Sequence, residues 1–291
     1  MSPIQANLEK ATQLFAEGKF REAEAIAKEL LAANPRDVNA GLLLGRVALH
    51  ARAFNEAEKL LRKVVEMAPR FMIAWHDLGT ALTEQGKEEE AIKALEQALE
   101  MEPNNASSHY YYAAALAMAG RTEDSAAAYK RAVSLDPDLA GAYIGLGHVL
   151  KTLGDQEGGI KAYRAAIALR PNFGEIYFSL SNLKTFRFSD TEIEDMVERI
   201  NQDSLPSESI VHFAFSLGKA FEDQKNYDLA YQYYSQGNEA HRNSIVYDPV
   251  QTEVAHTKIK ETFSQNFFDR IKQTEVGVQY PAPLFIIGLP R

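Results

Sequence analysis

The sequence predicts an all-α protein, a superhelical solenoid of antiparallel helix pairs. Five prolines recur at a constant interval of 34 residues, and a repeat of this length is typical of helical arrays whose units pack on their neighbours. Between the prolines, apolar residues lie three or four positions apart, as on one buried face of a helix. The prolines are Pro35, Pro69, Pro103, Pro137 and Pro171.

The unit at residues 72–105 shows why each repeat is expected to form two helices. Gly86 ends the first helix, because glycine tolerates the left-handed backbone that follows a last turn. Pro103 ends the second helix, and small residues at Gly79 and Ala91 allow the two helices to approach closely. Asn104 is expected to cap the next helix. The inward apolar residues are Trp75, Leu78 and Leu82 in the first helix and Leu95 and Ala98 in the second.

This pattern resembles the tetratricopeptide repeat, a helix-turn-helix unit of 34 residues. The resemblance covers five units, at residues 4–37, 38–71, 72–105, 106–139 and 140–173. It implies a right-handed solenoid, and it implies less about function. In the second unit Arg52 stands where the neighbouring units turn on glycine. The residues that match best are Trp75, Leu78, Gly79, Ala91, Ala98 and Pro103, with Tyr143, Leu146, Gly147, Tyr163, Ala166 and Pro171 in the fifth unit.

Four segments are predicted along the chain. The repeat array, with one further helix after the fifth unit, occupies residues 4–188. Residues 189–246 form a linker helix to about Ile200, capped by Ser189 and Glu192, and then a divergent repeat-like unit at 211–244. Residues 247–282 form a connecting helix, which Asp248 caps and which runs from Pro249 to about Ile271, and a linker. Residues 283–291 form a short strand that opens an α/β domain.

Composition excludes several function classes. The net charge of −9 argues against nucleic-acid binding, which needs a basic face. The chain has no cysteine, so thiolate zinc sites are excluded, and its seven histidines show no metal-binding spacing. Neither a signal peptide nor an apolar run of membrane-spanning length is found, so no membrane association is expected and the cytoplasm is the expected compartment.

The resemblance implies that the first helices of the repeats line an inner groove. Aromatic and hydrogen-bonding side chains there suit an extended protein or peptide ligand. An equal alternative is that several of them are solvated or pack on neighbouring helices. The lysine and asparagine pairs with which chaperone-binding relatives hold a C-terminal carboxylate are absent. The predicted groove residues are Arg46, His76, Asp77, Tyr110, Tyr111, His148, Phe178 and Asn182, with His50 at an equivalent position.

The last nine residues differ from the rest of the chain. A short apolar run with two β-branched residues, Leu284–Ile287, precedes Gly-Leu-Pro-Arg, as a buried strand precedes a phosphate-binding loop. The segment resembles the opening of the phosphosulfate-binding loop of sulfotransferases, on the match of Gly288, Pro290 and Arg291. Bacterial proteins that join tetratricopeptide repeats to a sulfotransferase domain have the same order of parts.

That resemblance implies a donor, 3′-phosphoadenosine-5′-phosphosulfate, and in-line transfer of its sulfuryl group to an acceptor. Arg291 would stabilise charge on the transferring group. The rest of the loop and the catalytic base would follow Arg291, so the chain as given holds no catalytic residue and is expected to be inactive.

Other interpretations of the sequence stay open. Gly288 could equally begin a nucleotide-hydrolase loop, or the terminal residues could be a tail without chemistry. The repeats could also belong to a stand-alone adapter that mediates protein–protein interaction or self-association. A glycosyltransferase attached to the repeats is a further alternative, which Gly-Leu-Pro-Arg does not favour.

Overall fold

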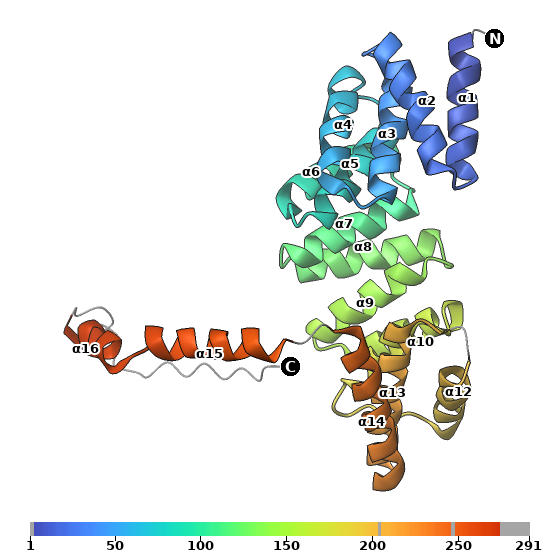
Figure 1. Ribbon diagram of the computed structural model, residues 1–291. Coiled ribbons are helices and arrows are strands. Elements are labelled where there is room, and N and C mark those ends of the chain that lie inside the picture. The colour runs from blue at the N-terminus through green and yellow to red at the C-terminus, as the bar shows by residue number, and fades with distance from the viewer. Residues whose placement is uncertain (1–2, 203–204, 246–247, 274–291) are drawn as a thin grey trace. The chain divides into compact units, whose positions relative to one another are not determined.

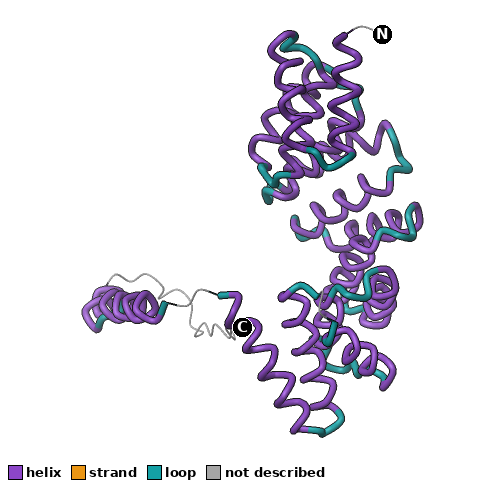
Figure 2. Tube along the Cα trace, turned by 45° about the vertical axis from the view of Figure 1, so that its right-hand side comes forward, coloured by secondary structure: helices purple, strands orange, loops and turns teal. Residues whose placement is uncertain are grey.

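The computed structural model describes residues 3–202, 205–245 and 248–273, and over these residues the chain forms sixteen helices and no strand (Figures 1 and 2). The chain divides into two compact units, Met1–Asn238 and Glu239–Arg291. The all-α prediction is confirmed for the described part of the chain. The predicted strand at 283–291 lies outside the described residues.

The first ten helices form five consecutive pairs, and one repeat proline follows the second helix of each pair. The second helix of each pair packs on the first helix of its own pair and on the first helix of the next one. The first helices of successive pairs also contact one another, so one surface of the array consists of first helices alone. The helices are α1 (Pro3–Ala16), α2 (Phe20–Ala33), α3 (Val38–His50), α4 (Phe54–Met67), α5 (Met72–Glu84), α6 (Glu88–Met101), α7 (Ala106–Met118), α8 (Thr122–Leu135), α9 (Ala140–Thr152) and α10 (Gln156–Leu169).

The turn inside each pair depends on one residue with left-handed backbone. Gly86, with φ of +68°, ends α5, and the following N–H of Lys87 donates to the carbonyl of Leu82 at 3.0 Å. This bond satisfies a carbonyl that the helix end would otherwise leave free. Gly120 and Gly154 adopt the same conformation, as predicted, and Arg52 adopts it too, with φ of +56°.

Close approach within a pair also follows the prediction. A Cβ atom on Gly79 would lie 2.4 Å from Cγ of Leu95, so only glycine lets α5 and α6 come this close. Ala91, on α6, is fully buried. The predicted cap at Asn104 is wrong by one residue: α7 begins at Ala106, and the side chain of Asn105 accepts from the N–H of Ser108 at 2.9 Å.

After the fifth pair the regular alternation changes. The short helix α11 (Gly174–Ser181) packs directly on α13 (Ser207–Asp223), and α12 (Asp190–Ile200) packs on α13 as well. A Cβ atom on Gly174 would lie 2.6 Å from the carbonyl oxygen of Ser209, which explains how α11 and α13 come so close. Helix α14 (Tyr227–Ser244) follows, with the ring of Tyr234 over Gly218 of α13.

The linker helix begins and ends as predicted. Ser189 accepts from the N–H of Glu192 at 3.3 Å, and the side chain of Glu192 accepts from the N–H of Ser189 at 2.8 Å. This reciprocal cap satisfies two donors at the start of α12, and α12 ends at Ile200. The outer boundaries given for the four predicted segments stay predictions.

The second compact unit contains α15 (Pro249–Thr262) and α16 (Gln265–Gln273). Asp248 caps α15 through the N–H groups of Val250 and Gln251, as predicted. The prediction of one helix to about Ile271 is wrong, because the backbone leaves the helical region at Phe263, where ψ is 49°. The carbonyl of Ser264 then accepts the first bonds of α16, from Phe267 and Phe268.

Candidate functional site

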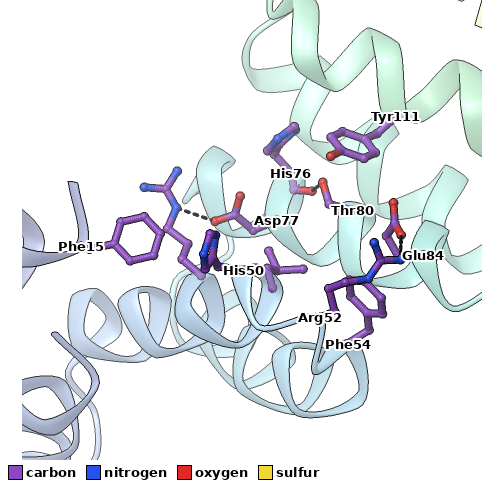
Figure 3. A pocket seen from close by; sticks show the side chains of 11 residues that line it. Phe15, His50, Arg52, Phe54, His76, Asp77, Thr80, Glu84 and Tyr111 are labelled. Atoms are coloured by element: carbon purple, nitrogen blue, oxygen red, sulfur yellow. Dashed lines mark hydrogen bonds and ion pairs between the residues drawn. The ribbon is translucent and has the colours of Figure 1, made fainter. Parts of the chain in front are cut away.

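A pocket of about 500 Å³ opens between the first helices of the first four repeats (Figure 3). Four of the eight predicted groove residues line it: Arg46 on α3, His76 and Asp77 on α5, and Tyr111 on α7. His50, at an equivalent repeat position, lines it too. The remaining lining residues are Phe15, Leu49, Arg52, Phe54, Thr80 and Glu84.

An ion pair spans the pocket between the second and third repeats. Nε of Arg46 donates to Oδ2 of Asp77 at 2.9 Å, and the Asp77 side chain is only 8% exposed. Burial raises the pKa of the Asp77 carboxyl above its ordinary value, although Arg46 acts in the opposite direction. The two outer nitrogens of Arg46 make no hydrogen bond among the described residues, so they are available to a ligand.

His76 is held in one orientation by the next repeat. Its Nδ1 lies 2.9 Å from Oγ of Ser108, a residue of α7 that is fully buried. Burial lowers the pKa of the His76 imidazole, which favours the neutral ring. The ring edge meets Tyr111, with the ring centroids 5.7 Å apart. Nε2 of His76 makes no hydrogen bond among the described residues, and His76 lines the pocket.

The pocket is also lined by residues at positions where the repeat pattern did not predict a groove residue. The guanidinium of Arg52 lies 5.6 Å from the ring centroid of Phe54 and 3.9 Å from the carboxylate of Glu84 (Figure 3). His50, which stands at a predicted repeat position, is supported by Phe20, whose ring stacks on it with centroids 3.6 Å apart. Phe15 and Phe54 do not stand at the repeat positions of the predicted groove residues, and only the spacing of aromatic residues next to the turns could have indicated them.

The structure does not bring Tyr110 and His148 to this pocket. Tyr110 lies against Gly141 of α9, where a Cβ atom would be 3.3 Å from its ring, and its centroid is 6.1 Å from that of Tyr129. Nδ1 of His148 lies 2.8 Å from the hydroxyl of Tyr163 in the same repeat. These contacts match the alternative that some groove positions pack on neighbouring helices.

Phe178 and Asn182 also lie away from the pocket. Phe178 stacks on His212 of α13, with centroids 5.3 Å apart and an interplanar angle of 28°. Asn182 is the C-cap residue of α11. Because α13 covers α11, a contact that the repeat phase does not predict, Phe178 is engaged within the fold.

The described residues contain no group of three or more histidine, cysteine, aspartate or glutamate side chains placed to hold a metal ion. Within the same ranges, no helix has both the length and the apolar character needed to cross a membrane. The predicted donor-binding residues Gly288, Pro290 and Arg291 lie outside the described part of the chain.

Comparison with known families agrees with the repeat geometry. Three models of the tetratricopeptide repeat family match residues 14–82, 76–140 and 140–173. Together these matches cover more than half of the 291 residues. The chain therefore belongs to the tetratricopeptide repeat family, and its helical array is a tetratricopeptide repeat scaffold.

Solved structures share this fold at low sequence identity. MamA from Desulfovibrio magneticus RS-1 is 19% identical, with a TM-score of 0.52 over 58% of this chain and 95% of that chain. Another MamA structure is 22% identical, with a TM-score of 0.50 over 59% of this chain and 94% of that one. At these identities the likeness concerns the fold alone.

A curated relative matches a smaller part of the chain. It is a protein of Aquifex aeolicus (strain VF5) described as uncharacterized, 25% identical over 111 residues. The match covers 38% of this chain and only 14% of the length of that relative.

Proposed function

We propose that the surface formed by α1, α3, α5 and α7 binds an extended peptide segment of a partner protein. The observation that carries the proposal is the pocket of about 500 Å³ on that surface, which four successive first helices line with aromatic and polar side chains. Pockets that bind ligands commonly have volumes of about 300–1,000 Å³. A pocket of this size can take one or two side chains of a peptide.

The polar atoms of the pocket suit a peptide backbone. Arg46 offers two unpaired guanidinium nitrogens, and His76 offers Nε2, while Nε of Arg46 and Nδ1 of His76 are already fixed by protein partners. An extended peptide has unpaired N–H and C=O groups that need such partners. Phe15 and Tyr111 add aromatic area, which contributes to binding at little cost in side-chain entropy.

The test is selection of a random peptide library against the full chain, followed by fluorescence anisotropy with one selected peptide. We expect Tyr111→Ala to weaken binding by about tenfold or more, in the range of a residue that dominates an interface. Tyr231→Ala is the matched control, because Tyr231 on α14 is 74% exposed and lies outside the pocket. Equal losses in both variants would contradict the proposed site.

The same variants test self-association through this surface. If the chain itself is the ligand, sedimentation equilibrium should show an oligomer that Tyr111→Ala dissociates and Tyr231→Ala does not.

We propose as a second candidate that the scaffold belongs to a sulfotransferase with 3′-phosphoadenosine-5′-phosphosulfate as its donor. The support is the spacing of Gly288, Pro290 and Arg291 after an apolar run. A stand-alone adapter fits the repeat array equally well. The two candidates differ in what the complete reading frame encodes after Arg291: Ser-Gly-Thr supports the enzyme, and a stop codon supports the adapter.

A binding experiment also distinguishes the sulfotransferase candidate from the stand-alone adapter. The protein expressed from its complete reading frame should bind 3′-phosphoadenosine-5′-phosphate, measured by calorimetry, and Arg291→Ala should weaken this binding by about tenfold. Arg36→Ala, a change of the same charge on an exposed turn before α3, should leave it unchanged. No measurable binding by the complete protein would remove the enzyme candidate.

A further inference from the structure

A second groove lies between α12 and α13, outside the five regular repeats. Its volume, about 520 Å³, is close to that of the peptide pocket, and it shares no residue with that pocket. Helix α12 contributes most of the lining, and the end of α13 closes the other side. The lining residues are Asp190, Ile193, Glu194, Val197, Glu198, Asn201, Phe221 and Gln224.

One side of this groove carries only negative charge. Asp190, Glu194 and Glu198 are four residues apart on α12, so their carboxylates line up along one face of the helix. All three residues are exposed. Asp190 accepts a hydrogen bond from Gln224 at 3.0 Å, and Glu194 and Glu198 form no ion pair with any described residue. No lysine, arginine or histidine lines the groove.

The floor of the groove is apolar and preformed. Ile193 is 5% exposed, and Val197 and Phe221 are partly buried beside it. The ring of Phe221 stacks on Tyr233 with an interplanar angle of 6° and centroids 5.5 Å apart, so this ring is supported from α14. Met196, fully buried on the other face of α12, fixes the rotation of the helix and keeps the carboxylates at the surface.

The dimensions of the groove match a helix. The lining extends along all of α12, eleven residues or about 16 Å at ~1.5 Å per residue, to the C-cap residue Asn201. A ligand helix of three turns has this length, and its side chains at every fourth position have the spacing of the three carboxylates. We propose that the groove between α12 and α13 is a docking site for a basic amphipathic helix of a partner protein.

Charge and shape select this occupant. Apolar side chains of the ligand cover Ile193, Val197 and Phe221, while lysine or arginine on the neighbouring face approaches the carboxylates. An acidic helix would place like charges against Glu194 and Glu198 and would be rejected. Exposed charge pairs are screened by salt, so the apolar floor is needed for the binding that remains at high ionic strength.

The test uses the full chain and a fluorescein-labelled peptide of about 14 residues, built from leucine at helix spacing i, i+3, i+4, i+7 and lysine elsewhere. Fluorescence anisotropy should show saturable binding. The double variant Glu194→Gln/Glu198→Gln should weaken binding by about tenfold, because it removes two ion pairs with the peptide and each pair accounts for part of this loss of affinity. Glutamine keeps the helix propensity of glutamate, so α12 is retained in the variant.

Three controls distinguish binding of the peptide in this groove from general attraction of a basic peptide to an acidic protein. Glu29→Gln/Glu66→Gln makes the same charge change at exposed positions on α2 and α4 and should leave the affinity within about twofold of the original. A lysine-only peptide and a peptide with glutamate in place of lysine should both bind at least about tenfold more weakly.

Three results would overturn the proposal. The first is equal weakening by the two double variants, and the second is equal binding of the lysine-only peptide, since either result would mean that net charge alone attracts the ligand. The third is a dimer of the chain without peptide that Glu194→Gln/Glu198→Gln dissociates in sedimentation equilibrium. That dimer would make a second copy of the chain the occupant.

Discussion

Nε of Arg46 on α3 lies 2.9 Å from Oδ2 of Asp77 on α5, so one ion pair joins the second and third repeats at the wall of the peptide pocket. The two partners differ in exposure: the Arg46 side chain is 41% exposed and that of Asp77 is 8% exposed. Arg46 therefore opposes the effect of burial on the Asp77 carboxyl, while the exposed guanidinium remains open to a ligand.

Replacing Arg46 by methionine should destabilise the array at pH 7. The change leaves the Asp77 carboxylate buried without its cation, at a cost of about 1–2 kcal/mol after allowance for the exposure of Arg46. Asp77 already has a raised pKa. The cost should therefore be largest at neutral pH and should disappear as the pH falls through the raised pKa of Asp77.

Urea denaturation at pH 7 and pH 4 measures this difference. Arg70→Met is the control, because Arg70 is exposed and makes no ion pair within the described ranges. A destabilisation by Arg46→Met that is equal at both pH values would show that lost packing, and not the unpaired carboxylate, is the cause.

The sequence predicted the helix pairs because their determinants are local. Gly86 and the caps at Ser189 and Asp248 act within four residues of their position, and each was found where the pattern placed it. The candidate site depends on contacts that cross repeats. Ser108, in the next repeat, holds the His76 ring in place, and α13 covers Phe178. Neither contact can be predicted from the position of a residue within its own repeat.

Alanine at Gly79 should destabilise the third repeat. Its Cβ atom would lie 2.4 Å from Cγ of Leu95, and overpacking of this kind costs about 1–3 kcal/mol. The gain in helix propensity from glycine to alanine offsets about 1 kcal/mol, so we expect a net loss of about 1 kcal/mol in urea denaturation. In Gly79→Ala/Leu95→Ala the total loss should be smaller than the sum of the two single losses. Additive losses would mean that α5 and α6 move apart without strain.

Glycine at Arg52 should stabilise the second repeat. Arg52 has φ of +56°, a conformation that costs a side chain about 1–2 kcal/mol, while glycine lowers stability by about 0.5–1 kcal/mol through the entropy of the unfolded chain. The exposed pair with Glu84 at 3.9 Å contributes little. We expect a gain of up to about 1 kcal/mol in urea denaturation.

The reverse change provides the comparison for Arg52. Gly154 has φ of +84° and no atom within 4 Å of a Cβ built on it, so Gly154→Ala introduces backbone strain without a clash. It should destabilise the array by about 1 kcal/mol. If Arg52→Gly also destabilises the protein, the contact of Arg52 with Phe54 outweighs the backbone strain.

Glu58 should make the array sensitive to acid. Burial alone would raise the pKa of its carboxyl, but hydrogen bonds from Lys87, Arg62 and Gln85 outweigh burial and lower the pKa to about 2. A carboxyl with a depressed pKa in the folded state adds stability above its unfolded pKa of ~4.3, and this stability is lost as the pH falls towards 2. Because Lys87 and Arg62 are about 40% exposed, we expect a contribution of about 2 kcal/mol at pH 7.

Glu58→Gln tests this contribution. The variant should lose about 2 kcal/mol relative to the original chain in urea denaturation at pH 7, and this difference should shrink as the pH falls towards 2, since the Glu58 carboxyl then becomes protonated in the folded chain. Glu66→Gln, at an exposed position on the same helix without an ion pair in the described part of the chain, should change stability by less than about 0.5 kcal/mol. A constant difference between Glu58→Gln and the original chain from pH 7 to pH 2.5 would show that the carboxylate charge does not stabilise the junction of α4 and α6.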